Sequence, residues 1–276
     1  MQRLVAVGKA LFHRVQTADT AAYAAALAYN FLFALFPLLL FLTALLGLLH
    51  LPSIASFFRG PGRVLIAPSL RHLILAVTTE ARRHRSPTLL SVGAIGFIWA
   101  MSGAIRQLVD ALNHAYRIAH PKRPIWATIL LSLGLGILVG VALTAAEAVM
   151  ALGGDAVGWL SSGVVHHPLS PLLMACIRWA VLFALMWIVL TVVYNWLPDH
   201  IERMRWMTPG TGAVMVLWIL ISVGFAFYVS HFNHYNKTYG SLGAVILLML
   251  YLYILSFSLL IGAELNAIWF TDGSEP

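Results

Sequence analysis

Two ionisable side chains lie inside long apolar runs of this 276-residue chain. Glu147 lies near the end of one run, and Arg178 lies near the start of the next. Charged side chains within a membrane span are costly, and they usually face a bundle interior or a wet cavity. If both runs are helices, the two charges lie within ~10 Å of the same membrane face. This spacing predicts an intramembrane ion pair, either a structural clamp or part of a transport path.

A second group of polar side chains lies toward the other ends of the apolar runs. Four runs contribute to the group at a similar depth, and their convergence predicts a polar vestibule that a solute or ion enters from the cytoplasm. For any single residue, snorkelling or helix capping at the membrane surface is the alternative. The candidate substrate-binding residues are Tyr29, Asn30, Arg106, Asp110, Tyr194, Asn195, Glu264 and Asn266.

Signatures of catalysis, metal binding and cofactor binding do not occur in the sequence. No Gly-x-x-x-x-Gly-Lys-Ser/Thr motif is present, so ATP is not expected to drive transport directly within this chain. The dense His and Asp ligand motif of zinc nucleases is also missing. We therefore predict a protein that is not an enzyme and has no catalytic residues, metal site or cofactor.

The composition indicates the elements that must position these side chains. Hydrophobic residues make up 61% of the chain and charged residues 10%, with a mean hydropathy of +0.86. Soluble domains are about 25% charged, so this composition excludes an ordinary soluble enzyme and a disordered chain. The net charge of +7 fits basic residues at a membrane surface better than a nucleic-acid partner.

Six apolar runs are long enough to cross a bilayer, which needs roughly 20 helical residues. We predict an all-α polytopic membrane protein, with residues 1–276 forming a single domain around a bundle of six transmembrane helices. The long loop 50–87 carries apolar residues on one helical face, which predicts an amphipathic helix there. The predicted spans are about 24–49, 88–109, 125–152, 171–197, 209–230 and 242–270, and Pro37 is expected to kink the first.

Basic residues near the span ends predict the orientation of the chain. They are frequent before the first span and in the second and fourth loops, and scarce in the third and fifth loops. Because short cytoplasmic loops are enriched in Lys and Arg, both termini are expected in the cytoplasm. The long first loop is rich in Arg yet lies outside in this topology. Membrane lipids are the expected partners, and the oligomeric state is left open.

Several short motifs, in their order and spacing, resemble the YihY/BrkB family of bacterial inner-membrane proteins. The resemblance covers about residues 15–270 and implies six spans and a plasma-membrane location. Some family members were once labelled ribonuclease BN, a label that the missing ligand motif does not support here. The motifs are AALAYN (25–30), LFPL (35–38), ALNHAY (111–116), PGTGA (209–213), YNKTYGSLGA (235–244) and GAELNA (262–267).

Two functions remain open from the sequence. The first is a transporter or flippase-like protein for a small solute, an ion or an amphipathic molecule. It is favoured by the predicted kinked first span and by polar groups converging from four spans. The second is an envelope scaffold that organises lipid or partner proteins without transport. A continuous polar cavity would distinguish the first from the second.

Overall fold

The computed structural model shows an all-helical chain. It describes residues 2–17, 19–48, 87–118, 123–124, 126–139, 141–142, 145–146, 171–199, 206–231 and 235–271. Within these ranges every regular element is a helix, which confirms the predicted fold class. The predicted amphipathic helix of the first loop lies outside the described residues.

The long helices follow the apolar runs of the sequence. Five segments are long and apolar enough to cross a membrane, and a shorter apolar helix covers Trp126–Val139, where the third span was predicted. The five segments are Thr20–Leu38, Ser91–Ala115, Trp179–Trp196, Pro209–Val229 and Val245–Phe270. The helices are α1 (Gln2–Thr17), α2 (Thr20–Leu48), α5 (Pro87–Ala115), α7 (Pro171–Trp196), α8 (Pro209–His231) and α9 (Tyr235–Thr271).

Three boundaries differ from the sequence predictions. Helix α1 precedes the first span, where no helix was expected. Helix α5 continues six residues past the predicted end at 109, because its last turns are buried against other helices. Helix α9 begins seven residues before the predicted start at 242, through a polar stretch assigned to the preceding loop. Hydropathy alone does not detect helical turns that extend beyond the apolar run.

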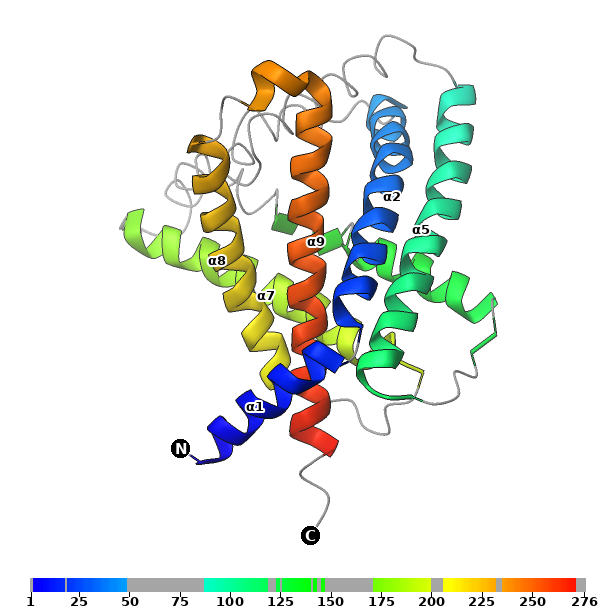
Figure 1. Ribbon diagram of the computed structural model, residues 1–276. Helices are drawn as coiled ribbons and strands as arrows, with labels where there is room; N and C mark the ends of the chain where they lie inside the picture. Colours follow the sequence, from blue (N-terminus) through cyan, green and yellow to red (C-terminus); the bar gives the residue numbers. More distant parts are fainter. Residues whose placement is uncertain are drawn as a thin grey trace, which may run out of the picture.

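One end of the bundle, which we call the packed end, brings together the start of α2, the ends of α5, α7 and α9, and the start of α8. The helix α1 and the end of α9 lie on this side of the molecule, at the bottom of Figure 1. Helix α9 lies centrally and contacts α1, α2, α5 and α8. Helix α1 lies obliquely across the packed end beside α9 (Figure 1).

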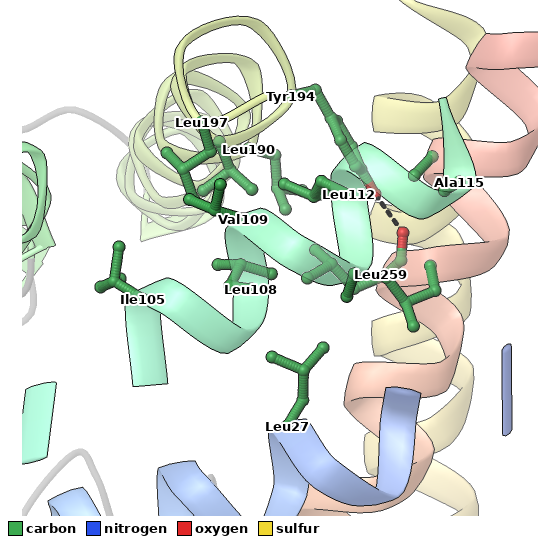
Figure 2. Packing of buried hydrophobic residues seen from close by; sticks show 14 of the residues in the cluster. Leu27, Ile105, Leu108, Val109, Leu112, Ala115, Leu190, Tyr194, Leu197 and Leu259 are labelled. Carbon is green, nitrogen blue, oxygen red and sulfur yellow. Dashed lines mark hydrogen bonds between the residues drawn. The ribbon is translucent and has the colours of Figure 1, made fainter. Parts of the chain in front are cut away.

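The hydrophobic core also lies at the packed end. Figure 2 shows Leu27 of α2, Leu112 of α5 and Leu259 of α9 close together, with side chains of α7 above them. Away from this end the helices expose large apolar side chains, among them Trp99, which is 81% exposed. Such surfaces are stable against lipid rather than water. The buried cluster includes Ala24, Leu27, Ile105, Leu108, Val109, Leu112, Leu190, Leu197, Val214, Leu259 and Leu260.

Helix α5 ends in a defined backbone motif. Arg117 adopts a left-handed conformation with φ of 56°, and the N–H of Ile118 donates to the carbonyl of Asn113 at 2.9 Å. This is the hydrogen-bond pattern of a Schellman C-cap, where glycine is usual. A non-glycine residue is strained in this conformation, so contacts with the surrounding structure must compensate for the strain.

Candidate functional site

The start of α8 is capped by a side chain from another span. A helix begins with backbone N–H groups that have no partner inside the helix. Pro209 has none to satisfy, and the Thr211 N–H donates to Oγ1 of Thr208 at 3.3 Å. The N–H of Gly210 donates to Oδ1 of Asn266 in α9 at 2.7 Å. Asn266 therefore joins α9 to α8 through a buried hydrogen bond.

Two glycines let these helices approach. A Cβ placed on Gly210 would overlap the carbonyl oxygen of Gly262 and would lie 2.6 Å from the side chain of Asn266. A Cβ on Gly262 would collide with Val214 and with the hydroxyl of Tyr194. Because backbone occupies the space at Gly210, the contact cannot adjust by rotating a side chain. Both positions therefore require glycine for close packing.

Two tyrosines extend the network beside this contact. The hydroxyl of Tyr194 donates to the carbonyl of Leu259 at 2.7 Å, which joins α7 to α9 (Figure 2). The amide of Asn266 donates to the hydroxyl of Tyr116 at 3.4 Å, just beyond the end of α5. Burial raises the pKa of Tyr116 to about 12, with a smaller contribution from the negative charge of Glu264. Tyr116 therefore keeps its proton at physiological pH.

A buried carboxylate is paired with the helix outside the spans. Glu264 of α9 is 2% exposed, and its Oε2 lies 3.6 Å from Nη1 of Arg14 in α1. Arg117 and His114 also interact electrostatically with this carboxylate. His114 in turn stacks on Tyr23 of α2, with ring centroids 4.7 Å apart. One basic side chain thus pairs with this acidic group, and two others act on it from further away.

A third polar cluster fixes the end of α7. Nε of Arg123 lies 3.1 Å from Oδ1 of Asp199, and the Arg123 guanidinium donates to the carbonyls of Trp196 and Leu197. Asn113 donates to Oδ2 of Asp199 at 3.0 Å and accepts from the Asp199 N–H at 2.9 Å. A cation on the last carbonyls of a helix is favourable because those oxygens carry partial negative charge. The cluster ties the ends of α5 and α7 together.

Sequence reasoning missed the members of this third cluster. In the sequence, Asn113 was only part of a motif, and Arg123 was only a basic residue of a loop. Asp199 follows the apolar run of α7. Their partners are 76 to 86 positions apart in the chain. The signal available in the sequence was the Pro198–Asp199 pair after an apolar run. An acidic side chain at the carbonyl end of a helix is unfavourable unless a cation lies nearby.

The predicted vestibule residues divide into three groups. Tyr194, Glu264 and Asn266 are buried together at the packed end. Asn30 and Asn195 each donate to the carbonyl four residues earlier in their own helix, at 2.8 and 2.7 Å. The remaining three residues, Tyr29, Arg106 and Asp110, are exposed on α2 and α5.

The predicted Glu147–Arg178 pair lies outside the described residues. Glu147 follows the last described helical positions of its segment, and Arg178 is in α7 without a described side chain. Within the described residues, no group of three or more His, Cys, Asp or Glu side chains is arranged to hold a metal ion. The pairing itself stays a prediction.

Comparison with known proteins identifies relatives of nearly the whole chain and of a part of it. A family model described as virulence factor BrkB matches residues 11–272. The ribonuclease-like protein YfkH of Bacillus subtilis is 31% identical over 264 residues, covering 94% of each chain. UPF0761 membrane proteins of Xanthomonas axonopodis and Xanthomonas euvesicatoria are 33% identical over 82 residues, which is 30% of this chain and 19% of theirs. No solved structure matches the chain.

Proposed function

Since this chain belongs to the BrkB family of membrane proteins, we propose that it is a transporter or flippase-like protein of the bacterial inner membrane. Its substrate would be a small solute, an ion or an amphipathic molecule. The basic residues near the span ends favour both termini in the cytoplasm, and the packed end would then face the cytoplasm.

One observation carries this proposal. The carboxylate of Glu264 is buried in a membrane span, and the salt bridge to it comes from α1, which is not one of the candidate spans. Ionisable groups in spans often line substrate or ion pathways. Because Arg14 belongs to a separate element, movement of α1 would uncover Glu264 without separating the packed spans.

The basic side chains around Glu264 would control what reaches it. With α1 in place, Arg14 pairs with the carboxylate, and the charge of Arg117 also acts on it. With α1 displaced, Glu264 would offer a negative charge to a cationic group of the substrate. The protein would therefore alternate between a state in which Arg14 occupies the site and a state in which the substrate does.

A scaffold without transport is the second candidate. It is supported by the hydrogen bonds Asn266–Gly210 and Tyr194–Leu259, which join spans rather than leaving polar groups for a solute. The large apolar side chains exposed on the spans would then bind lipid or partner proteins. On this hypothesis the Arg14–Glu264 pair only anchors α1.

The name of one relative raises the question of nuclease activity. YfkH is named as ribonuclease-like, and we propose that the present chain does not hydrolyse RNA. The sequence lacks the zinc-nuclease ligand motif, which supports this proposal. Incubating the purified protein with labelled RNA, with and without added Zn²⁺ or Mg²⁺, tests it directly. Release of short RNA fragments that requires the folded protein would contradict it.

Transport is tested in proteoliposomes with two probes, a fluorescent phospholipid for flipping and an internal pH dye for ion flux. We expect the wild type to exceed protein-free vesicles for at least one probe. Glu264→Gln should lower that rate at least about tenfold, equivalent to ~1.4 kcal/mol in the barrier. Asp19→Asn also removes a carboxylate charge, at an exposed position, and serves as the control. Folded wild-type protein that moves neither probe would favour the scaffold.

A further inference from the structure

The outward face of α5 changes from apolar to charged along one stripe. Val92, Ile95 and Trp99 are exposed, and two turns further on Arg106 and Asp110 are exposed as well. The spacing of these residues places them on one side of the helix. Helix α5 lies at the edge of the bundle in Figure 1, with α2 beside it.

Three tryptophans mark the membrane surface at this end. Trp126, Trp196 and Trp206 are each more than half exposed, and they lie where the helix Trp126–Val139 begins, where α7 ends and shortly before α8 begins. Exposed tryptophans of membrane proteins concentrate at the level of the lipid headgroups. The contacts of Arg123 with Asp199 and with the carbonyl of Trp196 hold two of these chain segments together.

The charged pair of α5 lies just below this level. Asn113, which is bonded to Asp199, is three residues beyond Asp110 and seven beyond Arg106. At 1.5 Å per residue, the two backbones lie about 5 and 10 Å below Asn113. The headgroup layer is roughly 5–7 Å thick, and an Arg side chain reaches outward by snorkelling. Both charged groups can therefore end among lipid headgroups.

The two charges are available for a ligand. Among the described residues, neither Arg106 nor Asp110 has a hydrogen bond or salt bridge, although the charges of Arg106 and Asp199 act on the Asp110 carboxylate. Residues four apart on a helix have Cβ atoms about 5–6 Å apart. A guanidinium and a carboxylate at this separation can bind an anion and a cation of the same small molecule.

From this arrangement we propose that Arg106 and Asp110 bind the headgroup of a zwitterionic phospholipid that carries a primary ammonium. Arg106 binds the phosphate and Asp110 binds the ammonium, while Trp99 and Ile95 contact the acyl chains. Along α5 the apolar side chains come before the charged ones, as the acyl chains of a lipid lead to its headgroup. An anionic phospholipid without an ammonium gains only the contact with Arg106 and is repelled by Asp110.

A second copy of the chain is the competing occupant of this stripe. Arg106 of one copy and Asp110 of the other would pair twice across a two-fold axis. The lipid is favoured because the stripe changes polarity once, at headgroup depth, whereas a dimer interface needs no such change. Lipid binding here does not depend on transport through Glu264.

The test measures lipid retained by the protein. The full chain is placed in nanodiscs of equal parts phosphatidylethanolamine and phosphatidylglycerol, extracted gently, and analysed by native mass spectrometry. We expect the wild type to retain phosphatidylethanolamine preferentially. Asp110→Asn should lower that preference at least about tenfold, the effect of one charge-assisted hydrogen bond. In nanodiscs that contain phosphatidylcholine in place of phosphatidylethanolamine, less of the zwitterionic lipid should be retained, because the ammonium of phosphatidylcholine has no N–H.

Control variants separate the outcomes. Lys9→Gln removes an exposed charge from α1 and should leave the lipid preference unchanged, and Glu264→Gln should do so even if it stops transport. Arg106→Gln should weaken retention of both lipids. An unchanged phosphatidylethanolamine preference in folded Asp110→Asn would overturn the proposal. So would a wild-type dimer that dissociates in both α5 variants while lipid retention is unaffected.

Discussion

The packed end and the outward face of α5 treat polar groups in opposite ways. At the packed end, Asn266 and Tyr194 bind the backbone of neighbouring helices, and Glu264 is paired with Arg14. On α5, Arg106 and Asp110 face outward. Buried polar groups stabilise a fold when they are paired and are costly when a partner is removed. Substitutions should therefore reduce stability at the packed end and binding at the outward face.

The largest effect is expected at the glycine contact between α8 and α9. Gly210→Ala introduces a Cβ that overlaps the carbonyl of Gly262, so the two helices must separate. We expect a loss of about 3 kcal/mol or more in the free energy of unfolding, measured by thermal melting in detergent. Gly224→Ala is the matched control, because the space around Gly224 is open. Equal melting temperatures for the two variants would contradict the close contact.

A smaller effect is expected for the helix cap from α9. Asn266→Ala leaves the buried N–H of Gly210 without its acceptor, which should cost about 2–3 kcal/mol. Asn30→Ala removes an amide that donates to the carbonyl of Ala26 within its own helix, and should cost less than about 1 kcal/mol. The free energies of unfolding of both variants are measured in urea or SDS. A larger loss in Asn30→Ala would show that the cap contributes little.

The buried tyrosine beside the cap predicts a loss of stability at high pH. The pKa of Tyr116 is raised from 10.0 to about 12 by burial, so the folded state holds the proton more tightly than the unfolded state. This contribution is fully present below pH 10 and is lost as the pH rises to about 12. It amounts to about 3 kcal/mol. Tyr116→Phe should lose less stability than the wild type over this interval, and parallel curves would refute the assignment.

The smallest effect on stability is expected on the outward face. Arg106→Gln and Asp110→Asn should each change the free energy of unfolding by less than about 0.5 kcal/mol, as is usual for surface positions. Melting temperatures in detergent without added phospholipid provide the measurement. A loss comparable to that of Asn266→Ala would mean that these side chains support the fold, and would remove the contrast between the two regions.

The sequence predicted the helical elements better than their polar contacts. Continuous apolar runs require helices in lipid, because unpaired backbone groups there are costly, so the positions of α2, α7 and α8 follow from hydropathy. The helix α1 was missed because its basic residues were interpreted only as an orientation signal. Its residue Arg14 pairs with a carboxylate 250 positions away, and no local pattern encodes that distance.

The candidate site was predictable in its residue types but not in its connections. Polar residues near span ends indicated Tyr194, Glu264 and Asn266, which the structure brings to the packed end. Hydropathy could not distinguish them from Asn30 and Asn195, whose amides bond within their own helices. The difference depends on which side of each helix meets a neighbour. Tertiary packing decides this, and the glycines at 210 and 262 permit it.

The central claim, that movement of α1 controls access to Glu264, is tested by comparing two substitutions in the proteoliposome assay. We predict that Glu264→Gln lowers the rate for the transported probe at least about tenfold, because the site loses its charge. Arg14→Gln should raise the initial rate, because α1 no longer covers the carboxylate. Rates equal to the wild type in both folded variants would contradict the claim.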